Sequence, residues 1–308
     1  MSETLTYSPP VISIDVEDWP QSTWDPNLPI TDRAVDNTRR VLRILREVNV
    51  RATMFVLGKL AERFPHVVKE IQAEGHEVAC HGYGHVEISL QSPDEFLADI
   101  RRAKDLLEQI TGEKVKGYRA PDFSIVRDTL WAFDALAEAG FEYDSSVVPV
   151  RLVRYGIPDW PVQPVQVGLA GGRTILEAPL ATCRWFGKNR PVGGGGYHRL
   201  LPGFLTRYFA NQAMAKAPFV FYCHPYEFDV HELTEIPLAL PLRVRLHQGL
   251  GRRWFEQRFR SFVQRFGGQR MQDLLSSQQW SEFNLRTLGS DSLSKPTPSS
   301  EILSEQIH

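Results

Sequence analysis

The chain has 308 residues, of which 42% are hydrophobic and 23% charged, and its formal net charge is -2. This composition is that of an ordinary globular protein, not of a disordered or fibrous chain. The balanced charge argues against nucleic acid as the main partner, because nucleic-acid-binding domains usually carry a basic excess.

The three cysteines, Cys80, Cys183 and Cys223, are widely spaced and odd in number, which argues against a disulfide framework. The first ten residues contain neither a basic region nor an apolar run, so the sequence predicts no secretory signal. It also contains no run of about 18 apolar residues that would predict a membrane span. We therefore expect a cytoplasmic protein.

Strands and helices are predicted to alternate, since short runs of β-branched and aromatic residues are separated by stretches with apolar residues at helical spacing. The helix at 92–110 has the best-marked start, because Ser92 and Glu95 form a capping-box pattern. In chain order the predicted elements are strand 11–15, helix 32–48, strand 52–57, helix 59–74, strand 77–81, helix 92–110, strand 115–119, helix 127–139, strand 141–144, two strands within 162–181, helix 200–215 and strand 219–224.

This alternation predicts an α/β fold in which helices cover a parallel sheet. Periodicity alone does not decide between an open sheet and a barrel. In both, reactive side chains collect at the carboxyl ends of the strands. Five ionisable residues end predicted strands, namely Asp15, His81, Arg119, Asp144 and His224. We therefore expect an active site at this edge, although polar residues are also common where loops begin.

Three carboxylates follow the first predicted strand within four residues: Asp15, Glu17 and Asp18. Such groups repel one another unless a cation or a basic group lies among them. On an extended chain Asp15 and Glu17 point to the same side. The alternative is a solvated acidic loop, but the position directly after a buried strand favours a site.

Two histidines, His81 and His85, lie four residues apart with glycines between them. Imidazoles at this spacing can converge on one ion from a helical turn or a tight loop. Two nitrogens and one carboxylate oxygen, with positions left for water, are typical of a hydrolytic metal site. His66, His76 and His198 have no such partner and are interpreted as surface or loop histidines.

Arg119 and His224 have side chains suited to the remaining steps of a hydrolysis. An arginine at a strand end can hold a carboxylate through a bidentate pair, or it can simply cap the sheet. A histidine at the end of an apolar strand is costly to bury without a partner. His224 therefore suits a proton donor, although an isolated histidine in such a place is more often a satisfied core residue.

Four motifs follow one another along the chain: the acidic motif, H-x3-H, the arginine-proline motif and the histidine after the last strand. In this order they resemble the polysaccharide deacetylase family with the NodB homology domain (carbohydrate esterase family 4). The similarity covers roughly residues 8–230. VEDW at 16–19, LEAPL at 176–180, GGGGYHRLLP at 193–202 and HPYEFD at 224–229 also resemble the subfamily associated with exopolysaccharide and exosortase loci.

This resemblance implies a distorted, seven-stranded (β/α) barrel over residues 8–230. It also implies a metal-dependent hydrolase that removes N-acetyl groups from an N-acetylated sugar or polysaccharide, so that a carbohydrate is the expected partner. By motif, Asp15 matches the general base, Arg119 the arginine that tethers the base, and His224 the general acid.

The resemblance further implies a divalent metal, typically zinc, with His81 and His85 as the histidine ligands. Either Glu17 or Asp18 matches the acidic ligand. The common motif has adjacent aspartates, whereas here Val16 separates Asp15 from the next acid. Glu17 is favoured because its same-side geometry matches a D-x-D variant in the related allantoinase-like and peptidoglycan deacetylase branch.

Substrate contacts are expected from Tyr83, Asp122 and Phe123. In the family an aromatic residue usually follows the proline of the arginine motif, whereas here Asp122 precedes Phe123. A backbone N–H near these two residues is expected to stabilise the oxyanion. Each aromatic residue could equally serve packing. The glycines at 193–196, in a predicted long loop, permit either close approach of a ligand or a flexible connection.

A C-terminal extension over 231–287 is predicted to be helical. Its segment 243–270 has eight arginines and a single acid, Glu256. We expect it to pack on the barrel, with contact to a membrane surface or a glycan-assembly partner as the alternative. The apolar face of the extension comprises Trp254, Phe255, Phe259 and Phe262.

The tail at 288–308 is rich in Ser, Pro and Thr and is predicted to be disordered. The sequence leaves the number of subunits open.

Two other functions compete with deacetylation. One is an allantoinase-like hydrolase of a small cyclic amide or ureide on the same scaffold; the presence of both histidines and the acids favours a metal and a sugar instead. The other is a glycan-binding protein without activity. The intact set of base, ligands and acid argues against it, whereas fold resemblance alone would not.

Overall fold

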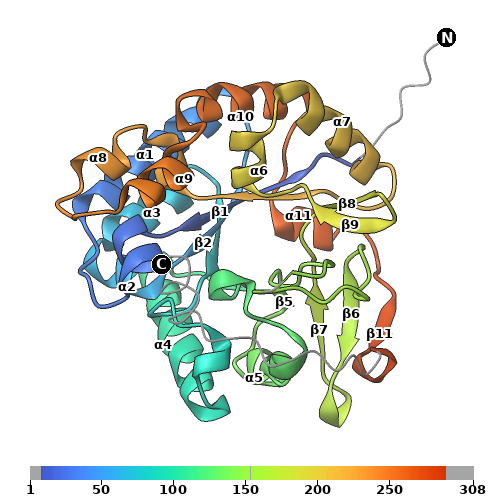
Figure 1. Ribbon diagram of the computed structural model, residues 1–308. Helices are drawn as coiled ribbons and strands as arrows, with labels where there is room; N and C mark the ends of the chain where they lie inside the picture. Colours follow the sequence, from blue (N-terminus) through green and yellow to red (C-terminus); the bar gives the residue numbers. More distant parts are fainter. Residues whose placement is uncertain (1–7, 153, 289–308) are drawn as a thin grey trace.

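The fold is a mostly parallel sheet surrounded by helices, seen in a computed structural model that describes residues 8–152 and 154–288 (Figure 1). All but the first residue of the predicted disordered tail therefore lie outside the described residues. The strands of the main sheet are β1 (Val11–Val16), β2 (Thr53–Val56), β3 (Glu77–Cys80), β4 (Gly117–Tyr118), β5 (Tyr143–Asp144), β6 (Val165–Gly168), β7 (Thr174–Glu177), β10 (Val220–Cys223) and β11 (Glu282–Asn284).

The sheet has the order β10-β1-β2-β3-β4-β5-β7-β6-β11, and its first seven strands run parallel to one another. This confirms the predicted α/β class with seven parallel strands. All six residues of β1 are buried, as expected for a strand covered on both faces. The two strands predicted within 162–181 are β6 and β7, which pair antiparallel.

The two edges of the parallel sheet are joined by irregular chain. Beyond β7, the Ala181 N–H donates to Val220 O of β10 at 3.3 Å, and the Tyr222 N–H of the same strand donates to Gly193 O at 2.8 Å. A Cβ at Gly193 would collide with Val220 O, so only glycine allows this approach. The first glycine of the 193–196 run thus serves the closure of a distorted barrel.

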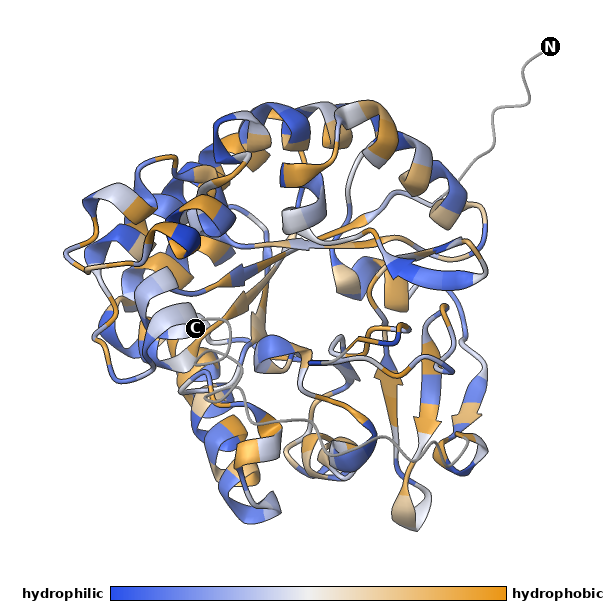
Figure 2. Cartoon of the chain, viewed as in Figure 1, coloured by the Kyte–Doolittle hydropathy of each residue, from blue (hydrophilic) through white to orange (hydrophobic). Residues whose placement is uncertain are grey.

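The helices lie around the sheet, and Figure 2 shows hydrophobic and hydrophilic residues alternating along them. The helices are α1 (Asp32–Glu47), α2 (Gly58–Arg63), α3 (Pro65–Ala73), α4 (Pro93–Thr111), α5 (Ala132–Glu138), α6 (Gly195–Leu200), α7 (Gly203–Met214), α8 (Glu232–Glu235), α9 (Leu242–Gly249), α10 (Arg252–Phe266) and α11 (Met271–Leu275). Short helices of one turn are η1 (Pro20–Trp24), η2 (Ile88–Leu90), η3 (Pro121–Phe123), η4 (Arg127–Thr129), η5 (Ala170–Gly172), η6 (Pro225–Phe228) and η7 (Leu285–Thr287).

Prolines divide two of the predicted helices. The segment 59–74 forms α2 and α3, with Pro65 at the start of α3. Around Pro202 the predicted helix 200–215 becomes the end of α6 and the whole of α7. Proline lacks the N–H that a helix interior requires and fits the first turn instead. The capping box of α4 is confirmed, since Ser92 Oγ accepts from the Glu95 N–H.

The C-terminal extension closes the amino-terminal end of the barrel. Met271 and Leu274 of α11 are buried in the cluster that also holds Val11 and Phe55 of the sheet interior. The Met271 N–H donates to Thr53 Oγ1 at 2.7 Å. The extension also adds β11 beside β6, which the helical prediction did not include. None of the helices in the described part of the chain has the length and apolarity that crossing a membrane requires.

Two surface features differ from the sequence predictions. Where a long loop was expected, β8 (Thr182–Trp185) and β9 (Lys188–Pro191) form an antiparallel hairpin. In α10, Phe255, Phe259 and Phe262 are buried as predicted, but Trp254 is 44% exposed. It sits one position outside the helical stripe that faces the barrel. The three cysteines are free and buried.

Candidate active site

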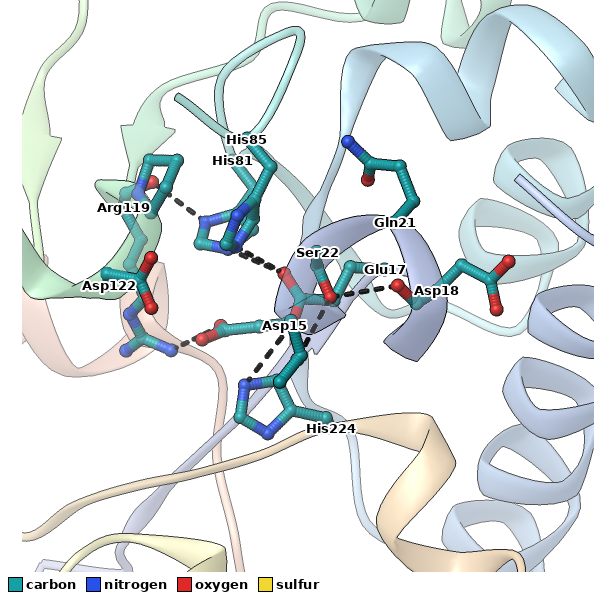
Figure 3. A network of polar contacts seen from close by, with 12 residues as sticks. Asp15, Glu17, Asp18, Gln21, Ser22, His81, His85, Arg119, Asp122 and His224 are labelled. Atoms are coloured by element: carbon teal, nitrogen blue, oxygen red, sulfur yellow. Dashed lines mark hydrogen bonds and ion pairs between the residues drawn. The ribbon is translucent and has the colours of Figure 1, made fainter. Parts of the chain in front are cut away.

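The carboxyl ends of the parallel strands bring the predicted site residues together (Figure 3). Asp15 is the fifth residue of β1, and Glu17 follows that strand directly. His81 follows β3, Arg119 follows β4 and His224 follows β10. Parallel neighbours end at the same edge of a sheet, so residues more than 200 positions apart in the chain lie side by side.

Glu17, His81 and His85 form the one cluster in the described residues whose donor atoms could hold a metal ion. One oxygen and two nitrogens lie within 4.8 Å of one another. Glu17 Oε2 is 3.2 Å from His81 Nε2 and 2.8 Å from His85 Nε2. Burial would raise the pKa of Glu17, but His85 and His81 hold that pKa well below its usual range. Glu17 is therefore an ionised carboxylate among nitrogen donors.

The backbone orients both histidines toward Glu17. His81 Nδ1 lies 2.9 Å from Arg119 O, which can only accept, so Nδ1 carries the hydrogen. That tautomer leaves a lone pair on Nε2, the atom facing Glu17. His85 has a φ of +58°, a left-handed conformation that is uncommon for a residue other than glycine. Such backbone strain is concentrated at functional sites.

Asp18, the other predicted acidic ligand, lies outside this cluster. Its Oδ2 accepts from the Thr31 N–H at 2.6 Å, at the start of α1. Figure 3 shows its side chain pointing away from the two histidines. Mainly through burial, the pKa of Asp18 is raised to about 6. The sequence left two candidates for the acidic ligand. In the structure Glu17 lies beside both histidines, whereas Asp18 lies away from them.

Asp15 and Arg119 form a buried ion pair beside the cluster. Arg119 Nη1 lies 2.7 Å from Asp15 Oδ1, and Arg119 is fully buried. Three further guanidinium hydrogens go to Ser13 Oγ at 2.9 Å and to the carbonyl and hydroxyl of Ser145 at 2.9 and 3.0 Å. The guanidinium also lies over the Phe55 ring, 4.1 Å from its centroid. These contacts fix the fork that orients Asp15.

Asp144 lies behind this ion pair and does not line the cavity. It is paired in register with Glu177 of β7, and both carboxyl groups are fully buried. The two hydrogen-bond to each other, and burial followed by the charge of Asp144 raises the pKa of Glu177 well above its usual value. Ser146 Oγ donates to Asp144 Oδ1 at 2.6 Å, next to the serine that holds Arg119. The pair therefore supports the arginine from behind.

His224 lies on the other side of Glu17, with Nε2 3.6 Å from Glu17 Oε1. Its Nδ1 is 3.0 Å from Glu227 Oε1, and its ring stacks on Tyr226 with centroids 4.7 Å apart. Burial would lower the pKa of His224, but the hydrogen bond to Glu227 and the charge of Glu17 outweigh it and raise the pKa. The imidazole is thus held in the form that can donate a proton.

Sequence reasoning missed Glu227. It lies three residues after His224, on η6, where the chain turns back over the strand end. A Cβ on Gly195 would collide with Glu227 Oε1, so the glycine run makes room for this carboxylate. The sequence feature that could have identified Glu227 is its position three residues after His224 in the motif HPYEFD.

A cavity of about 1110 Å³ opens above these residues and is lined by Asp15, Glu17, His81, His85, His224 and Glu227 among others. Asp122 and Phe123 also line it, but Tyr83 does not. The Tyr83 hydroxyl donates to Glu62 Oε2 at 2.7 Å and its ring lies under Arg102, so the predicted substrate contact is a packing contact between helices.

Asp122 and Phe123 have left-handed backbones, with φ of +55° and +52°. The Asp122 carboxylate pairs with Arg154 at 2.9 Å on the cavity wall. The Phe123 N–H donates to Ala120 O at 3.2 Å. That N–H closes a turn and is not available as a free oxyanion donor.

Residues 8–143 match the family described as polysaccharide deacetylase. This segment is therefore a polysaccharide deacetylase domain. Residues 145–276 match a second family, described only as a domain of unknown function, DUF3473. The deacetylase segment contains the Glu17–His81–His85 cluster, Asp15 and Arg119, whereas His224 and Glu227 lie in the second segment. The candidate site therefore spans both family segments.

Curated relatives match about a third of the chain. A peptidoglycan-N-acetylglucosamine deacetylase of Bacillus cereus is 36% identical over 96 residues, which are 31% of this chain and 35% of that protein. A chitooligosaccharide deacetylase of Azorhizobium caulinodans is 33% identical over 85 residues, which are 27% of this chain and 40% of that protein. The chain thus spans well under half the length of these relatives.

Solved structures support the fold across the whole chain. A crystal structure of a candidate polysaccharide deacetylase from Mycobacterium smegmatis superposes with a TM-score of 0.57 over 96% of this chain and 97% of that one, at 20% identity. A 4-α-glucanotransferase from Thermococcus litoralis gives the same TM-score over 90% of this chain and 42% of that one, at 14% identity. At these identities the likeness shows the fold alone.

Proposed function

We propose that the protein hydrolyses the N-acetyl amide of an N-acetylated sugar within a glycan. The observation that supports this proposal is the placement of an oriented carboxylate, Asp15, and an imidazole held for proton donation, His224, on two sides of Glu17 in one cavity. Amide hydrolysis requires both a base for water and an acid for the leaving amine.

The residues around Glu17 fit a divalent cation. Glu17 Oε2 is buried and has no hydrogen-bond partner, although two imidazole nitrogens face it. Two histidine nitrogens with one carboxylate oxygen are a donor set for zinc, and other divalent ions accept it too. When bound, such an ion polarises the acyl carbonyl and acidifies water.

Asp15 is placed to take the proton from the attacking water. Its carboxylate faces the cavity, while Arg119 holds it in one orientation. Neither side chain has to rearrange during the reaction, because Arg119 is fixed by Ser13 and Ser145. General-base catalysis from such a group contributes about 10²- to 10⁴-fold.

His224 is placed to protonate the leaving nitrogen. An amine leaves poorly as an anion, so the C–N bond breaks only as the nitrogen gains a proton. Glu227 holds Nδ1 and thereby presents Nε2 to the cavity. The acid then returns to its protonated form when it takes a proton from solvent.

The cavity favours a glycan over a small cyclic amide. Its volume of about 1110 Å³ exceeds the size of pockets that enclose small ligands, roughly 300–1,000 Å³. Trp24, Tyr155, Tyr222 and Tyr226 also line it, and aromatic faces of this kind suit sugar rings. The relatives named above act on peptidoglycan N-acetylglucosamine and on chitooligosaccharides by name, which is consistent with this substrate class.

The test is acetate release from short N-acetylglucosamine oligomers by protein that has been stripped with a chelator and then reloaded with zinc. We expect release only after reloading, and release about 10²- to 10⁴-fold slower from the Asp15→Asn variant. Release of ammonia or acid from cyclic ureides, with no acetate from the oligomers at full zinc occupancy, would contradict the proposal and favour the allantoinase-like alternative.

A further inference from the structure

Four large aromatic side chains are exposed on the β8–β9 hairpin and the neighbouring helix α7. They are Trp185 (51% exposed), Phe186 (86%), Phe204 (64%) and Tyr208 (56%), and we call them the aromatic patch. Trp185 stacks on Phe186 with ring centroids 5.1 Å apart. Figure 1 shows the hairpin beside α7, and Phe204 and Tyr208 lie one turn apart on the same side of that helix.

The tip of the hairpin presents an aromatic residue in an unfavourable backbone conformation. The two-residue turn is formed by Phe186 and Gly187, with φ of +48° and +74°. Asparagine or glycine suits the first position, whereas a bulky side chain is disfavoured there. Phe186 gains almost no burial in exchange, since it is 86% exposed. The folding of the chain therefore does not account for an apolar ring at this position, whereas contact with a binding partner would account for it.

The surroundings of the aromatic patch are basic. The sequence has no Asp or Glu between Glu177 and Glu227. The rim of the patch has four exposed cations, and within residues 8–152 and 154–288 none of them forms an ion pair with a carboxylate. The four are Arg184, Lys188, Arg190 and Arg207.

A second apolar stripe lies on α9. Leu242 and Leu246 of α9 are 71% and 63% exposed, and Leu250, which directly follows the helix, is 60% exposed. The sequence again has no acid between Glu235 and Glu256. Arg199 of α6, the helix that precedes α7, hydrogen-bonds to the carbonyl of Gln248 in α9. Arg199 and Gln248 both line the cavity, so α6 and α9 border it together.

We propose that the aromatic patch and its basic rim dock on the surface of an anionic lipid bilayer. Aromatic rings at the depth of the headgroups, with arginines and lysines facing anionic lipids, are the chemistry of interfacial binding. A second copy of this chain would bring the same basic rim and repel the first. A hydrated polysaccharide would leave the exposed leucines of α9 without an apolar contact.

The test is co-sedimentation of the intact chain with vesicles of phosphatidylcholine alone or mixed with phosphatidylglycerol. We expect binding to the mixed vesicles only, weakened by added salt. Trp185→Ser/Phe186→Ser should bind at least about tenfold more weakly, since two apolar side chains no longer enter the interface. Arg184→Gln/Arg207→Gln should lose roughly fivefold for each cation removed.

Val230→Ser provides the matched control, because Val230 is 46% exposed but lies outside the patch, before α8. It should bind as wild type does, and all variants should keep the wild-type circular dichroism. Absence of binding to anionic vesicles at low salt would overturn the proposal. So would binding that the patch variants leave unchanged, or a dimer in solution that the Trp185→Ser/Phe186→Ser variant abolishes. Vesicle binding is measured without substrate and is independent of the proposed hydrolysis.

Discussion

Glu227 Oε1 lies 3.0 Å from His224 Nδ1, although the two residues are only three positions apart in the chain. The same carboxylate oxygen accepts from the His224 backbone N–H at 3.2 Å, and Arg199 Nε is 3.5 Å from the other oxygen. Glu227 is therefore fixed on both sides. Because it raises the pKa of His224 against the effect of burial, it determines the pH range in which His224 holds a proton.

Glu227→Gln should move the alkaline limb of the pH–kcat profile to lower pH. Loss of the negative charge destabilises the imidazolium, which lowers the pKa of His224, so the acid loses its proton at lower pH. At a pH above the shifted limb, kcat should fall while the zinc content stays equal to wild type. The measurement is kcat against pH on N-acetylglucosamine oligomers. Glu235→Gln, an exposed acid of α8, is the control, and an unmoved limb in Glu227→Gln would rule out its role.

Asp15→Asn and His224→Ala should each lose about 10²- to 10⁴-fold in kcat, because each removes one proton-transfer group. Neither residue belongs to the Glu17–His81–His85 cluster, so the zinc stoichiometry should remain that of wild type. Single-turnover kinetics with parallel metal analysis tests both statements. Wild-type turnover by Asp15→Asn would show that another group takes the proton from water.

A pair of conservative variants distinguishes the two acids that follow β1. Glu17→Gln should lose zinc at equilibrium dialysis, because its Oε2 faces both imidazole nitrogens. Asp18→Asn should retain zinc, because its carboxylate accepts from the Thr31 N–H instead. Loss of zinc by Asp18→Asn at an unchanged melting temperature would mean that the ion is held differently from the arrangement seen around Glu17.

Most of this site could be predicted from the sequence, because each main residue follows a buried apolar run. Asp15 is the last residue but one of its strand, and His81 and His224 directly follow theirs. The hydrophobic pattern of these strands is unambiguous, and parallel strands end at one edge of the sheet. Glu227 could not be found in this way. It lies on η6, a single turn whose conformation no periodicity encodes.

The sequence also did not predict the direction in which some side chains point. Tyr83, in the loop between the two histidines, was expected in the cavity, but its ring packs against Arg102 on the helical side. His198 was interpreted as a loop histidine, yet it is buried with ring contacts to Phe221 and Phe262 at 4.9 and 5.0 Å. Burial lowers its pKa to about 4, so it is a neutral core residue. Sequence spacing predicts which helix, strand or loop a residue belongs to. Packing decides on which face of that element its side chain lies.

The buried Asp144–Glu177 pair predicts a stability difference that depends on pH. Burial, and then the charge of Asp144, raises the pKa of Glu177 in the folded protein, so the folded state holds a proton that the unfolded chain has already lost above its ordinary pKa. The free energy of unfolding therefore falls as the pH rises from that ordinary value toward the raised one. Glu177→Gln, whose amide mimics the protonated acid without titrating, should not show this fall.

The difference in unfolding free energy between Glu177→Gln and wild type should accordingly shift in favour of the variant between mildly acidic and alkaline pH. Urea unfolding at several pH values measures it. Near neutral pH the variant should keep Arg119 in place and retain most of its kcat, because the amide can still donate to Asp144. Asp144→Asn is the contrasting variant: it removes a charge that accepts from both the Ser146 hydroxyl and the Ser146 N–H, and it should lose stability at every pH. Parallel pH curves for Glu177→Gln and wild type would show that the pair holds no proton of its own.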